Sequence, residues 1–267
     1  MLGGMATFEG RPVTADDVLP LALTNLGHFT SMRVDADRTI RGLTLHMERL
    51  ARDCRAVWGA ELDTARVRDL VRAALEGHVT PCVVRVTVHD PGAEVGRRPG
   101  GERPGVLVTV RGAGGLPASP LRVRSVMYER DLPHVKHVGL FGALHARRTA
   151  QLAGGDDALF TGRDGLVSEG ATWNAGFVDH DGTVVWPRAP VLPGVTMALL
   201  QRHAPGAAHR TVPLTLDRAK GMAAAFATNT AIGVRPLGAI DGTDFPAGHP
   251  VLSALRETYL SIPGETV

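Results

Sequence analysis

Lys136 lies in the stretch LPHVKHV (residues 132–138), with Val135 before it and Val138 two positions after it. A lysine amine forms an imine with a carbonyl group only while it is uncharged, and burial among apolar groups favours the uncharged form. We therefore predict that Lys136 lies in a buried apolar strand and binds a carbonyl compound. The alternative is an ordinary surface lysine at the end of a strand.

Glu169 lies in SEGATWN (168–174), a stretch of mostly small residues. A carboxylate in such a turn can keep a pyridinium nitrogen protonated, and the protonated ring then accepts electrons from a neighbouring carbanion. The same carboxylate could also cap a backbone group or face solvent in a turn. Glu169 taken alone leaves these roles open.

The stretch VLPGVTMALL (191–200) has the pattern of a phosphate site. Pro193 and Gly194 turn the chain just before a predicted helix. The backbone N–H groups of Val195 and Thr196 would then lie at the helix N-terminus, which favours an anion, and the Thr196 hydroxyl adds a donor. Helix starts of this kind are common, so the pattern by itself is weak.

Two other residues have groups that suit an anion. Arg49, in HMERL (46–50), lies beside the apolar stripe of its predicted helix rather than opposite it, so its guanidinium could reach a phosphate or carboxylate. Thr230 lies with Thr228 and Asn229 between a predicted helix and a predicted strand. The alternative for Arg49 is a solvated helix arginine.

In this order, these stretches resemble the fold-type IV pyridoxal-phosphate enzymes, also called class IV aminotransferases. The family includes branched-chain and D-amino-acid aminotransferases and aminodeoxychorismate lyase. Its motifs are H-x-x-R-L, a strand-borne lysine, E-G-x-x-x-N, L-P-G-[IV]-T and a final threonine turn. The corresponding segments of this chain are HMERL (46–50), VK (135–136), EGATWN (169–174), LPGVT (192–196) and TNT (228–230).

The resemblance implies a role for each matched residue. Lys136 would form a Schiff base with pyridoxal 5'-phosphate (PLP) and move protons, and Glu169 would bind the pyridine nitrogen. Asn174 would stabilise the turn at the site. The phosphate group would be held by Arg49, Val195, Thr196 and Thr230. The family also implies a cofactor in a cleft between two domains, and a homodimer that completes the site.

Three positions depart from the family pattern. Thr30 stands where a glutamate is usual, Phe141 where aminotransferases often have a tyrosine five residues after the lysine, and Gly233 where they often have a glutamate. Phe141, Gly233 and the pair Lys136–His137 are closer to the lyase members. These departures concern the reaction and the substrate and leave the expected fold and cofactor unchanged.

The candidates for binding a substrate carboxylate or tuning the site are His28, Arg33, Tyr128 and Arg130. Arg33 and Arg130 could equally be structural. The segment 91–105, rich in proline, glycine and arginine, is a candidate lid, and the alternative is a disordered loop.

The hydrophobic pattern predicts an α+β protein of two domains. Period-3.6 spacing predicts helices, period-2 alternation predicts strands, and Gly-containing turns predict two hairpins. The expected helices are 38–60, 63–76, 140–153, 195–203 and 216–229, and the expected strands include 82–90, 106–110, 121–131 and 230–238. Together with the family resemblance, these elements imply a small N-terminal α/β domain (1–112), a linker (113–120) and a larger C-terminal PLP-binding domain with a pseudo-barrel (121–267), as in the D-amino-acid aminotransferase-like fold.

The composition argues against several classes of protein. The charges nearly balance, with 29 Lys and Arg against 27 Asp and Glu, and only 4% of residues are aromatic, so a nucleic-acid module is not expected. The two cysteines, Cys54 and Cys82, are too few and too far apart for a metal site and are expected to be buried free thiols. No membrane span or export signal is evident, so a cytoplasmic protein is expected.

We predict a PLP-dependent aminotransferase that moves an amino group between an amino acid and a 2-keto acid through a Lys136 Schiff base. The first alternative is lyase chemistry, with aminodeoxychorismate giving 4-aminobenzoate and pyruvate. The second is a cofactor-free binding protein of the same fold, against which the presence of Lys136, Glu169 and Thr196 argues.

Overall fold

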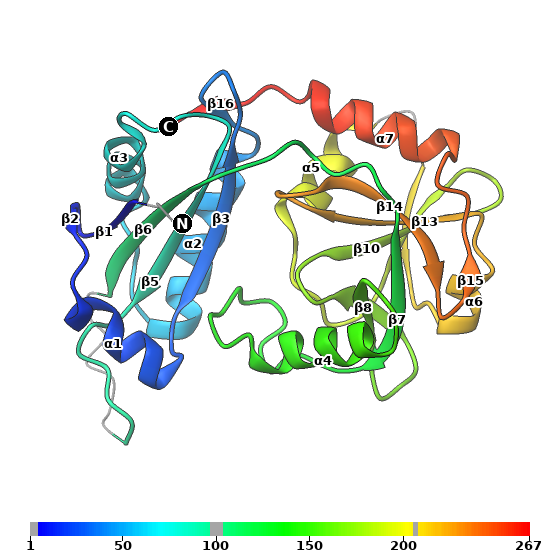
Figure 1. Ribbon diagram of the computed structural model, residues 1–267, viewed down its shortest axis with the longest axis horizontal. Coiled ribbons are helices and arrows are strands. Elements are labelled where there is room, and N and C mark those ends of the chain that lie inside the picture. The colour runs from blue at the N-terminus through cyan, green and yellow to red at the C-terminus, as the bar shows by residue number, and fades with distance from the viewer. Residues whose placement is uncertain (1–4, 97–103, 205–207) are drawn as a thin grey trace. The chain divides into compact units, whose positions relative to one another are not determined.

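The computed structural model describes residues 5–96, 104–204 and 208–267, which divide into two compact units (Figure 1). Unit 1 comprises the described residues up to Gly115 together with Val135–Gly139 and Pro263–Val267, and unit 2 comprises those of Leu116–His134 and Leu140–Ile262. The division after Gly115 falls within the expected linker. Lys136 belongs to unit 1, although the chain on both sides of its segment belongs to unit 2.

Unit 1 is an antiparallel sheet with helices packed against it. Five of the described strands form this sheet in the order β2-β1-β6-β5-β3, and β4 pairs separately with β16. Its elements are β1 (Met5–Phe8), β2 (Arg11–Pro12), α1 (Ala15–Thr24), β3 (His28–Val34), β4 (Thr39–Ile40), α2 (Leu43–Trp58), α3 (Thr64–Leu75), β5 (Cys82–His89), β6 (Gly105–Gly112) and β16 (Glu265–Thr266). Strand β3 is an edge strand, and this edge positions Lys136.

The core of unit 1 forms where α2 and α3 pack on the sheet. The predicted apolar stripe of α2 is buried, and Gly59 ends the helix in the left-handed conformation, as expected. Helix α2 begins later than predicted because residues 39–40 form β4. Cys54 and Cys82 are buried free thiols of this core, as the sequence predicts.

Unit 2 is a larger sheet surrounded by helices. Its strands are β7 (Leu121–Met127), β8 (Asp157–Thr161), β9 (Val167–Gly170), β10 (Asn174–Val178), β11 (Val184–Pro187), β12 (His209–Val212), β13 (Ala224–Asn229), β14 (Gly233–Ile240) and β15 (Thr243–Asp244). Its helices are α4 (Phe141–Leu152), α5 (Val195–His203), α6 (Leu216–Lys220) and α7 (Pro250–Ser261). Helices α4 and α5 and the hairpins β8–β9 and β10–β11 confirm the sequence pattern.

Strand pairing closes part of this sheet into a barrel. Consecutive pairs join β10, β13, β14, β7, β8 and β9, and β9 returns to β10 where Glu169 opposes Asn174. The side chains inside come from several strands and include Leu159, Phe177 and Ala225. Closure pairs the backbone groups that an open sheet would leave at its edges. The expected pseudo-barrel is confirmed, and its closing pair contains the predicted acid.

The helix predicted over 216–229 is wrong in its second half. Helix α6 ends at Lys220, and Ala224–Asn229 is strand β13. Alanine favours helices, but Ala225 and Ala227 alternate into the barrel core, where small side chains are needed. Tertiary packing therefore overrides local propensity here.

Two expectations about loops have different outcomes. Strand β6 continues through Gly112, so the Pro/Gly-rich break begins later than at residue 111. The candidate lid at 91–105 includes residues 97–103, which lie outside the described residues.

Candidate active site

The main chain around Lys136 lies along the free edge of β3. The Phe29 N–H donates to the Lys136 carbonyl at 2.8 Å, and the Val138 N–H donates to the Gly27 carbonyl at 2.9 Å. His137 and His28 form an isolated antiparallel bridge. Lys136 therefore does not lie in a regular strand, contrary to the prediction, but its backbone is held like that of an edge strand.

The side chain of Lys136 is partly buried, less than predicted. Its Nζ lies 4.8 Å from the centroid of the Phe29 ring, and Cζ of Arg85, on β5, lies 3.6 Å from the same centroid. Burial lowers the pKa of Arg85. Two cations thus share one aromatic ring, which attracts both through its quadrupole. Sequence reasoning did not select Arg85, although a charge in the apolar strand CVVRVTVH was a usable signal.

Arg49 belongs to a buried polar cluster between α2 and β3. Its Nη2 donates to the Thr30 hydroxyl, and that hydroxyl lies 2.7 Å from Nδ1 of His46. Burial, followed by the charges of Arg49 and Lys136, holds the pKa of His46 well below its ordinary value, so this imidazole is neutral. The direction of the hydrogen bond between Thr30 and His46 depends on which ring nitrogen carries the proton. Thr30, which replaces the usual glutamate, therefore connects Arg49 to His46.

Arg49 itself keeps an unused donor. Only 6% of the residue is exposed, and its buried Nε has no hydrogen-bond partner among the described residues. Burial lowers the pKa of the guanidinium to about 10, so it remains charged at neutral pH. An unpartnered, charged donor in a buried position is stabilised by an anion.

In unit 2 the predicted acid, Glu169, is the penultimate residue of β9 and lies inside a network of hydrogen bonds. Arg130 donates from Nε to Oε1 of Glu169 at 2.6 Å, and Nη2 of Arg130 donates to the Ala171 carbonyl at 3.0 Å. The backbone N–H of Leu192 donates to Oε2 at 3.3 Å. The Arg130–Glu169 pair is nearly excluded from solvent, with exposures of 9% and 4%. Arg130, predicted as a substrate residue, thus binds Glu169.

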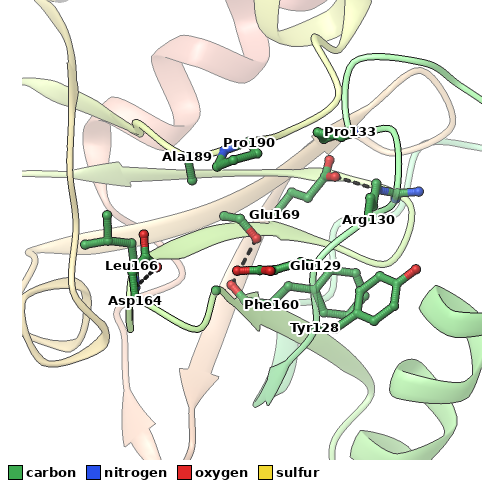
Figure 2. A pocket seen from close by; sticks show the side chains of 12 residues that line it. Tyr128, Glu129, Arg130, Pro133, Phe160, Asp164, Leu166, Glu169, Ala189 and Pro190 are labelled. Atoms are coloured by element: carbon green, nitrogen blue, oxygen red, sulfur yellow. Dashed lines mark hydrogen bonds and ion pairs between the residues drawn. The ribbon is translucent and has the colours of Figure 1, made fainter.

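Arg130 and Glu169 border a pocket of about 290 Å³ (Figure 2). Figure 2 shows the Glu169 carboxylate turned toward the Arg130 guanidinium, with Tyr128 and Phe160 on another side of the pocket. The rings of Tyr128 and Phe160 pack edge to face at 4.8 Å. Tyr128, also predicted as a substrate residue, therefore lies at the wall of the pocket that holds the predicted acid.

The turn LPG is fixed to Glu169 through Asn174. Nδ2 of Asn174 donates to the Leu192 carbonyl at 2.8 Å and reaches Oε2 of Glu169 at 3.5 Å. A Cβ on Gly194 would lie 1.9 Å from Oδ1 of Asn174, so only glycine fits at this position. The expected role of Asn174 in stabilising the turn is confirmed.

Helix α5 begins directly after this turn. Its first residues, Val195 and Thr196, are both buried, and the first intrahelical bond runs from the Ala198 N–H to the Gly194 carbonyl. The N–H groups of the first turn have no acceptor within the helix, and Gly194 has no side chain that could cap them. This end of α5 therefore has donors available for an anion.

The threonine turn joins β13 to β14 near Asn174. Thr228 is the cross-strand partner of Asn174, and Thr230 is half-buried in the turn that follows. Asn229 donates from Nδ2 to the Thr172 carbonyl at 2.9 Å, which fixes the turn to the segment after Glu169. The buried Thr228 hydroxyl has no partner among the described residues. Unit 2 thus brings together the predicted acid, the Asn174 support and the threonine turn.

The two remaining substrate candidates lie in unit 1. His28 is fully buried beside His137, and neither of its ring nitrogens has a partner among the described residues. Arg33 pairs with Asp35 at 3.1 Å and donates to the Gly114 carbonyl at 2.9 Å. The structure therefore places His28 beside the Lys136 segment and gives Arg33 structural partners.

Comparison with known families accounts for these groups together. The model of the family "Amino-transferase class IV" matches residues 27–240, most of the chain. The chain belongs to the class IV aminotransferases. This family is PLP-dependent, and the matched region includes the lysine, the acid, the LPGVT turn and the threonine turn described above.

Solved structures share the fold of this class IV aminotransferase. The branched-chain aminotransferase of Thermoproteus uzoniensis is 23% identical, with a TM-score of 0.85, over 97% of this chain and 94% of that one. A putative 4-amino-4-deoxychorismate lyase from Legionella pneumophila is 23% identical, with a TM-score of 0.82, over 94% and 95%. The PLP-bound form of a hypothetical aminotransferase from Mycobacterium tuberculosis is 19% identical, with a TM-score of 0.80, over 97% and 98%. A comparison with curated protein sequences gives no match.

The residues of this aminotransferase fit PLP chemically. Unit 2 offers a buried carboxylate and a helix N-terminus with available donors, and unit 1 offers an amine and a buried guanidinium nitrogen that has no partner among the described residues. PLP carries a ring nitrogen that suits the carboxylate, a phosphate that suits the helix N-terminus and the guanidinium, and an aldehyde that suits the amine. Among residues 5–96, 104–204 and 208–267, no helix is long and apolar enough to cross a bilayer.

Proposed function

We propose that this class IV aminotransferase transfers an amino group between an amino acid and a 2-keto acid, with PLP as its cofactor and Lys136 as the residue that binds it. The observation that carries the proposal is the setting of Lys136. Its main chain is fixed to β3, and its partly buried amine lies over Phe29 beside a second cation. Because the main chain of Lys136 is fixed, its amine can be held in one reactive position.

We propose the cofactor contacts from the chemistry of each group. Lys136 would hold the aldehyde carbon through Nζ, and Glu169 would accept a hydrogen bond from the ring nitrogen. Arg49 and the start of α5, at Val195 and Thr196, would bind the phosphate, with Thr230 as a further donor. Bound PLP supplies an electron-withdrawing ring that stabilises negative charge at the α-carbon of the amino acid.

The protein's own groups would then do two things. Once the amine of the amino acid has displaced it from the aldehyde carbon, Nζ of Lys136 would take the proton from the α-carbon. It would return that proton to the former aldehyde carbon, which the substrate nitrogen links to the α-carbon. Glu169, held by Arg130 and Asn174, would keep a proton on the ring nitrogen. Arg85 would bind the carboxylate common to amino acids and 2-keto acids, because its guanidinium lies over the Phe29 ring, close to which the Lys136 amine also lies. His28 and Tyr128 remain candidates for shaping the substrate site.

The test uses an unusual feature of the sequence: Lys136 and Lys220 are the only lysines. The protein would be incubated with PLP, reduced with borohydride and digested, and the labelled lysine would be identified by mass spectrometry. We expect the label on Lys136, with transamination lost in Lys136→Ala. Lys220→Ala is the matched control, since Lys220 pairs with Asp241 at 3.0 Å and should leave activity intact.

Two results would overturn the proposal. One is label on Lys220 or the N-terminal amine with none on Lys136. The other is an appreciable rate of amino transfer by Lys136→Ala.

A lyase is the second candidate, and two observations favour it. Phe141 replaces the tyrosine that aminotransferases often have, and a putative 4-amino-4-deoxychorismate lyase shares the fold. Pyruvate released from aminodeoxychorismate without an added keto acid would assign lyase activity. Amino transfer to a 2-keto acid would assign aminotransferase activity. A homodimer and a cytoplasmic location stay predictions, and light scattering of the purified protein tests the first.

A further inference from the structure

A buried carboxylate on α2 binds the main chain of Lys136 directly. Oδ2 of Asp53 accepts a hydrogen bond from the backbone N–H of Lys136 at 2.9 Å. Asp53 is fully buried and far from Lys136 in sequence. The Lys136 carbonyl accepts from the Phe29 N–H at 2.8 Å. Both backbone polar groups of Lys136 are therefore bound within unit 1, one to the helix and one to the sheet edge.

The carboxylate is itself held in one orientation. Oδ1 of Asp53 accepts from Nε and Nη2 of Arg52 at 3.1 and 2.8 Å, so each carboxylate oxygen has a donor. Burial lowers the pKa of Arg49, one helical turn earlier, and the negative charge of Asp53 acts in the opposite direction. Since Arg49 and Asp53 are four residues apart on α2, one face of this helix carries both a proposed phosphate donor and the contact to Lys136.

We infer that Asp53 is a positioning residue for Lys136: its carboxylate fixes the lysine main chain and thereby the position from which Nζ reacts with a carbonyl group. This inference rests on the proposed function for the role of Lys136, but the contact itself does not. Without Asp53, the Lys136 carbonyl would still be bound to β3, while its N–H would lose its acceptor. The segment would then remain on the sheet edge with a freer Lys136.

The first measurement follows the contact in the protein without cofactor. Backbone amide exchange would be measured at single-residue resolution in the wild type, Asp53→Ala and Asp53→Asn. A hydrogen bond to a charged group is worth about 10- to 100-fold in such an equilibrium, so we expect faster exchange of the Lys136 N–H by roughly that factor in Asp53→Ala. The Val138 N–H, bound to Gly27, should be unchanged. Asp53→Asn keeps an acceptor oxygen and should restore most of the protection.

The second measurement follows the consequence for the lysine. The rate at which Lys136 is labelled by PLP and borohydride would be measured against pH in the same variants. We expect a slower rate in Asp53→Ala by about 10-fold or more, with partial rescue in Asp53→Asn. Asp69→Ala is the matched control, because it removes an exposed helical ion pair with Arg72 in the same unit. It should change neither exchange at Lys136 nor labelling.

The outcomes separate the inference from the proposed function. Unchanged amide exchange at Lys136 in Asp53→Ala overturns the contact. Equally faster exchange at Lys136 and Val138 shows that the whole segment has become more mobile, and it overturns a specific effect of Asp53 on Lys136. Faster exchange with an unchanged labelling rate overturns the positioning role. Absence of label on Lys136 in the wild type instead overturns the proposed function and leaves the exchange result intact. If Asp53→Ala does not fold, Asp53→Ser replaces it in both measurements, because the shorter serine side chain does not bring its oxygen as far toward the Lys136 N–H.

Discussion

The Gly194→Ala substitution tests whether the LPG turn is fixed by Asn174 as the structure indicates. The added Cβ would lie 1.9 Å from Oδ1 of Asn174, far inside van der Waals contact. The backbone at Gly194 has φ of −73°, which any residue adopts, so the conflict is purely one of space. The Asn174 amide cannot simply swing away, because Nδ2 donates to the Leu192 carbonyl at 2.8 Å.

The magnitude follows from what must give way. Overpacking a filled site costs about 1–3 kcal/mol, and a buried group that loses its hydrogen bond costs a further ~1–3 kcal/mol. We therefore expect Gly194→Ala to lower the free energy of unfolding by roughly 2–5 kcal/mol. PLP affinity should also fall, because the start of α5 follows this turn and the Leu192 N–H that binds Glu169 belongs to it.

The assay is a double-mutant cycle followed by urea unfolding. In an Asn174→Ala background the amide is gone, so Gly194→Ala should cost far less, with a coupling of about 1–3 kcal/mol between the two sites. The lower preference for alanine as a helix cap is the same in both backgrounds and cancels. Gly248→Ala is the control, since a Cβ there meets nothing within 4 Å. Additive effects of the two substitutions would refute the reasoning.

Two further predictions concern buried charge. Replacing Arg130 by glutamine removes the ion pair of the buried Glu169, so the free energy of unfolding measured in urea should fall by about 3–5 kcal/mol. The control Arg163→Gln, in an exposed ion pair, should lower it by less than about 1 kcal/mol. Equally small effects of the two substitutions would contradict a stabilising role for the buried pair. Burial lowers the pKa of His28 from 6.5 to about 3. Between these pH values the unfolded chain binds a proton at His28 that the native state does not bind. The free energy of unfolding should therefore fall as the pH drops below 6.5, by up to about 1.4 kcal/mol per pH unit. His28→Leu should flatten this dependence relative to exposed His203→Leu, and an unchanged slope would show that His28 is not the cause.

Much of the fold could be predicted from the sequence because the patterns there are local. The apolar stripe of α2, the alternation in β5 and the glycine turns of the hairpins each depend on neighbouring residues. The alanines of β13 could not be assigned in this way. Their side chains suit a helix, and only the barrel around them, built from strands distant in sequence, requires small residues in a strand.

The residues of the candidate site also differ in whether local sequence or tertiary structure identifies them. Motif residues such as Glu169 and Thr196 could be selected from sequence because their spacing resembles a family. Arg85 and Asp53 could not be selected in this way. Their roles depend on contacts with residues distant in sequence, which are Phe29 on β3 for Arg85 and the main chain of Lys136 for Asp53. The sequence predicts Arg130 as a site residue, but its partner is set by the tertiary structure, in which the loop after β7 lies beside β9.

Thr30 shows how one departure from the family pattern can be understood physically. A glutamate at this position would place a carboxylate against Arg49, and a buried carboxylate would occupy the guanidinium as a paired ion. Threonine instead accepts one hydrogen bond from Nη2 and leaves Nε unpartnered among the described residues. The positive charge of Arg49 also interacts favourably with the charge of Asp53, one helical turn along α2. The substitution therefore keeps Arg49 available to an anion, and the cost of its burial is recovered when that anion binds.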